Sequence, residues 1–406
     1  MHLFIYGSSG IDKTALIQKA LLEAGIRPLS IDAGKITLAA QSLGIPNAES
    51  LSQEGQVILY TRTEPEDTLS QNQVLDMLDR PCQVIGLIGD RTDPFIGKLL
   101  AHPLARRAEL REDNRLAVAE VIHHFLVQAS LAKSLGIDLK PRPDGLGQTI
   151  AIIGGGGKTT LLYMLARELA AHGQRVIVTT TTHIRKPTAD QVPMTLTFDT
   201  ATGEPLQTGR QLSEISAALD RYGLVAVLQP TDETDIRGEK KMGPPRGLLE
   251  ALPQLADFIL AEADGSRGLP LKAPASYEPV FPPHTDYVMV LAGLSALNQP
   301  LQKVCHRPHL AAQRLGCDLD HRIQPADIAR LTIQSYGPQK DLPDRSRLRF
   351  LLNQADALLP DGPLGTHPPA DALKTAQVLL ELGADRVFIT SLQSAVPVLQ
   401  SFIKER

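Results

Sequence analysis

The sequence has few cysteines, little net charge and no long apolar run. Its 406 residues include three cysteines, Cys82, Cys305 and Cys317. These are too few and too scattered for a disulfide framework or a zinc site, which suits a reducing compartment. The net charge of −4 gives no reason to expect nucleic acid as a partner. No apolar run approaches the roughly 18–20 residues of a membrane span, and the first residues lack the basic and apolar regions of a signal peptide. We therefore expect a cytoplasmic protein that binds neither nucleic acid nor membrane.

The sequence does contain a buried strand at 149–153, a glycine loop and the start of an amphipathic helix. The loop and the helix start are Gly154, Gly155, Gly156, Gly157, Lys158, Thr159 and Thr160. This layout is typical of a phosphate-binding P-loop, in which glycines turn backbone N–H groups toward an anion and a helix N-terminus adds positive charge. Lys158 is expected to reach the β- and γ-phosphates, and the Thr159 hydroxyl to bind Mg²⁺. The loop therefore predicts Mg²⁺ with ATP or GTP as the cofactors, and all seven residues as the phosphate site.

The N-terminal segment begins like a second P-loop at residues 7–14. Asp12 replaces the glycine before Lys13, so a carboxylate would lie beside the phosphates. We interpret this copy as degenerate. Strands expected at 2–6, 28–32, 56–61 and 83–88 and a helix at 114–133 complete a small α/β domain. Pro and Gly are dense at 141–147. The predicted organisation is therefore a domain at 1–140, a linker at 141–147 and a nucleotide-binding domain at 148–406.

Apolar strands alternate with helical stretches through the larger domain. Strands are expected at 175–178, 224–228, 257–261, 286–291, 348–352 and 386–390, with helices at 212–222 and 370–382. This alternation predicts an α/β fold of the P-loop NTPase type, a mainly parallel sheet with helices on both faces.

Two carboxylates follow the strand at 257–261. Glu262 and Asp264 alternate along the chain, so both can face the nucleotide, where a P-loop protein places a Mg²⁺-orienting carboxylate. The alternative is an acidic loop that caps the next turn. Arg267 either neutralises charge on a transferring phosphoryl group or lies on the surface. The predicted catalytic residues are Lys158, Glu262, Asp264 and Arg267, and the predicted metal ligands are Thr159 and Asp264.

Three segments have both a binding and a structural interpretation. The threonines at 179–182 either pair in the sheet or place hydroxyls near Mg²⁺ or substrate. The proline-rich loop that follows Arg267 either holds Lys272 and Glu278 beside the site or only wraps the fold. The lysines within 238–243 either reach an anion or remain in solvent.

Two further segments lie nearer the C-terminus. Residues 305–309, Cys-His-Arg-Pro-His, are too compact for a recognisable metal site. Asn353 and Asp356 follow a strand with the spacing by which GTPases read guanine, where the Asp carboxylate accepts hydrogen bonds from the base. Gln354 replaces the Lys whose stem packs on that base, which leaves the choice between ATP and GTP open. Asn353 and Asp356 are predicted to bind the nucleotide.

Together these stretches resemble the YqeC family of selenium cofactor biosynthesis proteins, which are associated with selenium-dependent molybdenum hydroxylases. The matching residues are 153–159, 176–182, 262–274, 278–279, 306–308 and 352–356. The resemblance covers roughly 148–392, and the run from Glu262 to Pro274 is its most specific part. It implies a P-loop nucleotide-binding protein that acts in the maturation of these hydroxylases.

We therefore expect a Mg²⁺-dependent protein that binds ATP or GTP, hydrolyses it slowly and acts in selenium cofactor biosynthesis. The expected partners are the nucleotide and a selenium-dependent molybdenum hydroxylase or its cofactor-assembly proteins. Two alternatives remain open. One is a kinase that phosphorylates a cofactor precursor through the same loop, and the other is a non-enzymatic chaperone controlled by nucleotide.

Overall fold

The computed structural model divides the chain into two compact units. Unit 1 comprises Met1–Leu131, Leu359–His367 and Gln393–Leu399, and unit 2 comprises Ala132–Leu358, Pro368–Leu392 and Gln400–Arg406. The described residues are 131–140, 142–198, 208–232, 234–235, 238–337, 347–358, 368–394 and 397–404, together with the strands of a six-stranded sheet within 1–130.

Unit 1 is described by this sheet. Its strands are β1 (His2–Gly7), β2 (Pro28–Asp32), β3 (Lys35–Ala39), β4 (Gln56–Thr61), β5 (Ile85–Asp90) and β6 (Ala105–Glu109). The order is β2-β3-β4-β5-β1-β6, and β3 is antiparallel to both of its neighbours. Four of these strands were predicted from the sequence, whereas β3 and β6 were not. The P-loop-like residues that follow Gly7 lie outside the described residues. So do residues 114–130 of the helix expected at 114–133, whose last residues fall in α5 (Leu131–Ser134).

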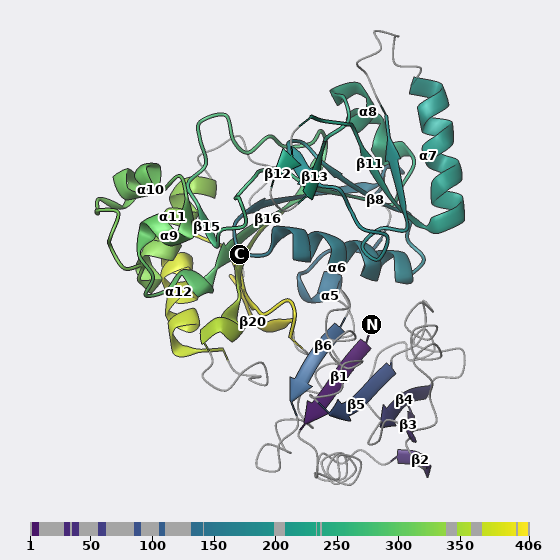
Figure 1. Cartoon of the computed structure of the whole chain (residues 1–406), viewed down its shortest axis with the longest axis horizontal. Coiled ribbons are helices and arrows are strands. Elements are labelled where there is room, and N and C mark those ends of the chain that lie inside the picture. Colours follow the sequence, from purple (N-terminus) through teal and green to yellow (C-terminus); the bar gives the residue numbers. More distant parts are fainter. Residues whose placement is uncertain are drawn as a thin grey trace. The chain divides into compact units, whose positions relative to one another are not determined.

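Unit 2 contains most of the described elements (Figure 1). Its strands are β7 (Gln148–Gly154), β8 (Val176–Thr180), β9 (His183–Arg185), β10 (Met194–Thr197), β11 (Leu224–Leu228), β12 (Thr234–Asp235), β13 (Gly238–Met242), β14 (Phe258–Glu262), β15 (Leu271–Lys272), β16 (Thr285–Gly293), β17 (Cys305–His306), β18 (Leu348–Asn353), β19 (Arg386–Thr390) and β20 (Val398–Ile403). Its α-helices are α6 (Lys158–Ala171), α7 (Thr208–Tyr222), α8 (Arg246–Ala251), α9 (Leu301–Val304), α10 (Pro308–Leu315), α11 (Pro325–Tyr336) and α12 (Ala370–Glu381), and the short α5 (Leu131–Ser134) precedes them. Single 3-10 turns are η4 (Leu252–Gln254), η5 (Leu294–Ala296) and η7 (Ala355–Leu358).

A nine-stranded sheet of order β10-β11-β8-β14-β7-β16-β18-β19-β20 forms the frame of unit 2. The strands from β10 to β19 pair in parallel, which confirms the predicted α/β fold with a mainly parallel sheet. From β7 the chain first builds the sheet toward β10 and later toward β20. A crevice forms beyond the carboxyl ends of the strands where the direction of strand addition reverses. β7 and β14 therefore end where a ligand site is expected.

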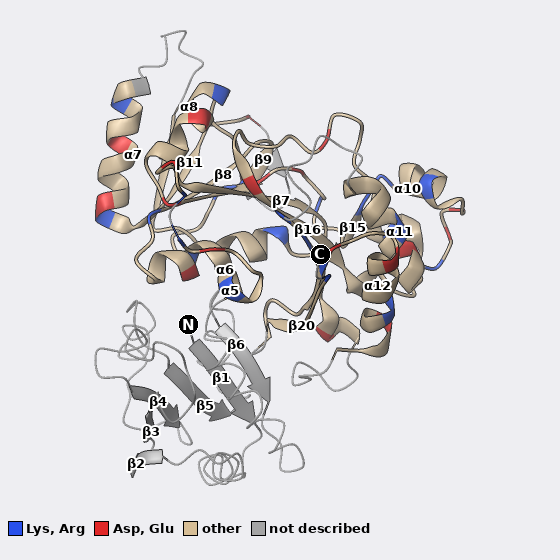
Figure 2. Ribbon diagram, turned by 180° about the vertical axis from the view of Figure 1, so that it is seen from behind, with Lys and Arg blue, Asp and Glu red and all other residues tan. Residues whose placement is uncertain are grey.

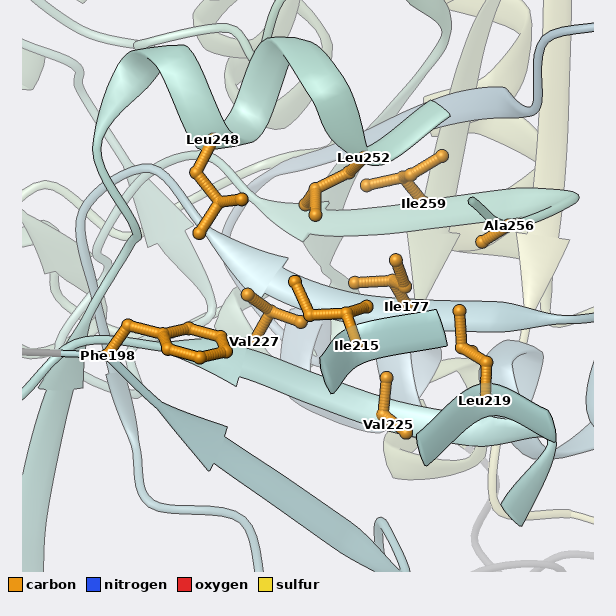
Figure 3. Packing of buried hydrophobic residues seen from close by; sticks show 10 residues of the cluster. All are labelled: Ile177, Phe198, Ile215, Leu219, Val225, Val227, Leu248, Leu252, Ala256 and Ile259. Atoms are coloured by element: carbon orange, nitrogen blue, oxygen red, sulfur yellow. The ribbon is translucent and has the colours of Figure 1, made fainter. Parts of the chain in front are cut away.

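Helices cover both faces of this sheet. Figure 1 shows α6 on one side and α7 with α8 on the other. Side chains alternate between the faces along a strand, and Ile177 and Ile259 point toward α7 and α8. There they pack with Ile215 and Leu219 in the apolar cluster of Figure 3. This packing fixes the strands that end at the crevice.

The polar side of α7 faces away from this cluster. The helix shows both basic and acidic residues in Figure 2, while its apolar residues Ile215 and Leu219 are buried. This is the pattern of an amphipathic helix on a sheet. Among the described residues, no helix is long and apolar enough to cross a membrane.

Residues 132–147 belong to unit 2 in the structure. Arg142 forms an ion pair with Asp286 at 2.8 Å. The Arg349 guanidinium donates to the carbonyl oxygens of Leu135 and Gly136 at 3.0 and 3.1 Å. The segment that the sequence places at the end of a first domain and in a linker is therefore packed within the larger unit.

Candidate functional site

The glycine loop, residues 154–157, joins β7 to α6 through close backbone contacts. Gly154, Gly156 and Gly157 have φ angles of 96°, 78° and 120°, which residues with a side chain rarely adopt. A Cβ on Gly154 would lie 2.1 Å from the Leu291 carbonyl oxygen, and one on Gly157 would lie 2.3 Å from Asn353 Nδ2. The loop therefore has its shape because it carries no side chains.

We expect Gly157→Ala to destabilise the protein by about 1–3 kcal/mol, because it adds both an unfavourable φ and a steric overlap. Gly247→Ala is the matched control, since that glycine lies in α8 and its Cβ would meet nothing within 4 Å. Urea denaturation of both variants measures the difference. Equal stability of the two would contradict the close packing of the loop.

The amide groups of the loop divide into two sets. The Gly154 N–H donates to both Asp264 oxygens at 3.1 Å, and those of Gly155 and Gly156 donate to the Leu291 and Leu269 carbonyl oxygens. The first amides of α6 have no partner within the helix, and no side chain caps them. The amides at the start of α6 are therefore the ones that can face an anion. Direct phosphate binding by Gly154, Gly155 and Gly156 stays a prediction.

Lys158, Thr159 and Glu262 meet at this helix N-terminus. Lys158 Nζ donates to the Gly154 carbonyl oxygen at 2.8 Å and lies 3.6 Å from Glu262 Oε1. The Thr159 hydroxyl donates to Glu262 Oε2 at 3.0 Å. Burial raises the pKa of Glu262, the Lys158 charge opposes this, and Asp264 adds to it. The carboxylate closest to Thr159 is thus that of Glu262.

Asp264 lies beneath the loop and is fully buried. Besides the Gly154 N–H, its carboxylate accepts from the Tyr336 hydroxyl at 3.1 Å and lies 3.3 Å from Lys158 Nζ and 3.1 Å from Lys272 Nζ. Both predicted carboxylates therefore approach Lys158, but Asp264 supports the loop from inside. Its assignment as a metal ligand stays a prediction. Nothing in the sequence indicated Tyr336, which comes from α11 and is 72 residues away along the chain.

A row of alternating charges continues from Asp264 to the protein surface. Lys272 Nζ is buried and lies 3.2 Å from Glu278 Oε2, which in turn accepts from the Arg307 guanidinium. Burial opposes ionisation of Glu278, but the hydrogen bond from Arg307 and the charge of Lys272 hold its pKa below the usual value. Lys272 and Glu278 therefore lie beside the site, as the first interpretation of the proline-rich loop expected.

Asn353 connects the glycine loop to the neighbouring strands. Its Nδ2 donates to the Gly156 carbonyl oxygen at 2.8 Å, and its Oδ1 accepts from the Thr390 hydroxyl and the Leu392 N–H. Asp356 is exposed and accepts from the Ser391 hydroxyl at 2.5 Å. The structure thus brings Asn353 to the predicted phosphate loop, while a contact of either residue with a base stays a prediction.

Of the predicted threonines and lysines, some form hydrogen bonds or ion pairs within the fold and others line the site. The hydroxyls of Thr179, Thr180 and Thr181 donate to the carbonyl oxygens of Val227, Glu262 and Val280, so these three serve the fold. Of the predicted lysines, Lys240 lines the site, and the buried Lys241 forms an ion pair with Glu239 at 2.7 Å.

One cavity of about 1390 Å³ is lined by Gly156, Gly157, Lys158, Thr159, Glu262 and Glu278 among others, whereas Asp264, Lys272, Asn353 and Asp356 do not line it. Basic or titratable residues on its wall are Lys158, Arg185, Lys186, Lys240, Arg267, Arg307, His183 and His306, and the acidic ones are Glu239, Glu262 and Glu278. Thr159, Thr160, Thr182 and Gln354 also line it. Within the described part of the chain, no group of three or more His, Cys, Asp or Glu side chains could hold a metal ion.

Comparisons with known proteins relate this chain to one family. A family model described as YqeC protein matches residues 150–309, which run from the glycine-loop strand to the Arg307 wall of the cavity. An uncharacterized protein YqeC from Escherichia coli (strain K12) is 31% identical over 229 residues, which is 56% of this chain and 81% of that protein. No solved structure matches the chain significantly.

Proposed function

Since the chain belongs to the YqeC family, we propose that it binds a nucleoside triphosphate, ATP or GTP, with Mg²⁺ and hydrolyses it slowly. The observation that carries this proposal is the meeting of Lys158 Nζ, the Thr159 hydroxyl and Glu262 at an uncapped helix N-terminus. That helix end offers amide donors and positive potential to phosphates. The glycines let the loop pack closely against Leu291 and Asn353, which holds the helix start in place.

The residues fit a Mg²⁺ ion of the kind that accompanies nucleotides. Mg²⁺ prefers oxygen ligands and is usually held by one or two carboxylates plus substrate phosphates, without a dedicated protein cage. The Thr159 hydroxyl and the Glu262 carboxylate supply such oxygens 3.0 Å apart. When bound, the ion would neutralise phosphate charge.

Each side chain of the site has a task in this proposal. Lys158 leaves its contact with the Gly154 carbonyl oxygen and pairs with the β- and γ-phosphates. Glu262 orients the Thr159 hydroxyl. Asp264 holds the loop through the Gly154 N–H and keeps Lys158 in place. Hydrolysis then depends on positioning and charge stabilisation, without a covalent intermediate.

Calorimetric titration of the full-length protein with ATP and GTP tests the proposal. We expect saturable binding with Mg²⁺ present, weaker binding after chelation with EDTA, and slow release of inorganic phosphate. A stoichiometry of two would indicate that the loop after Gly7 also binds. With a stoichiometry of one, loss of binding in Lys158→Ala would assign the site to the glycine loop. Absence of heat and of phosphate release with both nucleotides would contradict the proposal.

We further propose that this activity serves selenium cofactor biosynthesis, on the resemblance described for residues 148–392. Cells that lack the protein should lose activity of selenium-dependent molybdenum hydroxylases and retain that of molybdenum enzymes without selenium. Full hydroxylase activity in such cells would contradict this role.

A further inference from the structure

The cavity is larger than a nucleotide site needs. Small-molecule sites usually enclose roughly 300–1,000 Å³, whereas this cavity has about 1390 Å³. The glycine loop and the start of α6 form one part of its wall. Another part, which we call the arginine wall, consists of Arg267, His306 and Arg307. No task in nucleotide binding has been assigned to His306 or Arg307.

A short parallel pairing builds the arginine wall. β15 and β17 place Lys272 beside His306, and the Ala273 N–H donates to the His306 carbonyl oxygen at 3.0 Å. The chain then turns at Arg307, whose φ of 62° is left-handed, and enters α10. Arg267 also has a left-handed φ, of 54°. Such conformations cost about 1–3 kcal/mol and persist where the surroundings enforce them, often at ligand sites.

The wall holds its positive charge in a fixed position. The Arg307 guanidinium donates to Glu278, and Glu278 is itself held by the buried Lys272. Burial and the charges of Arg307, Lys272 and Arg267 lower the pKa of His306 to about 4. The ring is therefore uncharged at neutral pH and offers one donor and one acceptor beside two guanidinium groups. Planar guanidinium groups suit carboxylate and phosphate oxygens.

We propose that the arginine wall binds a second substrate of this enzyme, a small molecule that carries a carboxylate or phosphate group. The proposal rests on the nucleotide site proposed above, because it places this molecule in the same cavity as the nucleotide phosphates. Arg267 and Arg307 hold its anionic group, and His306 forms a hydrogen bond with it. Ion pairs connect Lys158 to Arg307 through Asp264, Lys272 and Glu278, and so fix the distance between the nucleotide subsite and the arginine wall.

Inorganic phosphate is the probe for this subsite. It is titrated into the full-length protein that carries Mg²⁺ and a non-hydrolysable nucleotide analogue, so that the glycine loop is occupied. The NMR signal of the His306 ring, assigned by its loss in His306→Gln, reports binding at the wall. We expect a saturable shift of this signal and a rise in the pKa of His306, because an anion stabilises the imidazolium form.

Arg307→Gln should weaken phosphate binding at least about tenfold, and Arg307→Lys should recover part of it. Arg246→Gln, which removes an exposed guanidinium on α8, is the matched control and should leave it unchanged. A His306 signal that phosphate does not move, or equal affinities in Arg307→Gln and Arg246→Gln, would overturn the proposal. So would a loss of nucleotide affinity in Arg307→Gln as large as the loss of phosphate affinity, because the arginine would then serve the nucleotide.

The same samples separate the two proposals. If the wild-type protein binds no nucleotide, the proposed function fails. Phosphate is then titrated without nucleotide into Lys158→Ala, in which the glycine loop has lost its lysine. A shift of the His306 NMR signal that depends on Arg307 would still establish an anion subsite. If nucleotide binds and phosphate does not, only the second-substrate proposal fails.

Discussion

Replacement of Lys158 by alanine should weaken binding of the Mg²⁺–nucleotide by about 1.5–3 kcal/mol, which is roughly 10- to 150-fold in affinity. The reason is that Lys158 Nζ is the cation at the start of α6 and can form charge-assisted hydrogen bonds with phosphates. In the structure its ammonium group is buried and lies 3.3 Å from Asp264 and 3.6 Å from Glu262. Calorimetric titration of the variant and the wild type measures the difference.

The variant also leaves the buried Glu262 without its cation and Asp264 with Lys272 alone, so a loss of folded protein must be excluded. Thermal unfolding of Lys158→Ala identifies a temperature at which it is folded, and the titration is made there. Lys374→Ala is the matched control, because Lys374 is exposed on α12 and does not line the cavity. Equal nucleotide affinities of the folded Lys158→Ala and of this control would remove the basis of the proposed function.

The sequence predicted the frame of the site because local pattern determines it. Apolar strands that end in Gly154, Glu262 and Asn353 are recognisable from hydrophobicity alone, and a parallel α/β sheet brings their carboxyl ends together. The structure confirms these strands as neighbours in the order β14-β7-β16-β18. The approach of both Glu262 and Asp264 to Lys158 follows from the same alternation along the chain.

The division of labour within the site could not be predicted, because it depends on distant contacts. That Asp264 supports the loop while Glu262 faces the cavity depends on Tyr336 of α11 and on Lys272. No local pattern marks a tyrosine at the end of a helix as a partner of a carboxylate. Of the arginine wall, Arg267 was predicted as a site residue, but His306 and Arg307 were missed for a similar reason. Residues 305–309 were considered only as metal ligands, and their role depends on the pairing of β15 with β17.

The short strands β9, β12 and β13 were also missed. They have two to five residues, and their pattern is that of polar loops. Only their antiparallel pairing, β13 with β9 and with β12, makes them strands. This pairing places Lys240 at the cavity. The sequence could therefore name the lysines within 238–243 as candidates for contact with an anion, but it could not tell that Lys240 is the lysine that lines the cavity.

Lys272→Met should lower the free energy of unfolding by about 3–5 kcal/mol at pH 7.5, since removal of one partner of a buried ion pair leaves uncompensated charge. The Lys272 side chain is fully buried, and its ammonium group lies between Asp264 and Glu278 at 3.1 and 3.2 Å. Methionine has a similar length and no charge, so it tests the charge more than the packing. Denaturation by guanidinium chloride measures the loss, with Lys374→Met as the exposed control.

The pH dependence of this loss distinguishes charge from packing. In the wild type the pKa of Glu278 lies below its ordinary value of 4.5, so the stability it contributes is present above that value and is lost as the pH falls through the folded pKa. In Lys272→Met, Glu278 loses one of its two cations, so its folded pKa moves back toward the ordinary value and less stability is lost as the pH falls. The gap in stability between wild type and variant should therefore narrow between pH 7.5 and about pH 4. A gap that stays constant over this range would show that Lys272 acts through its volume, and that the row of charges from Lys158 to Arg307 does not hold the two sides of the cavity together.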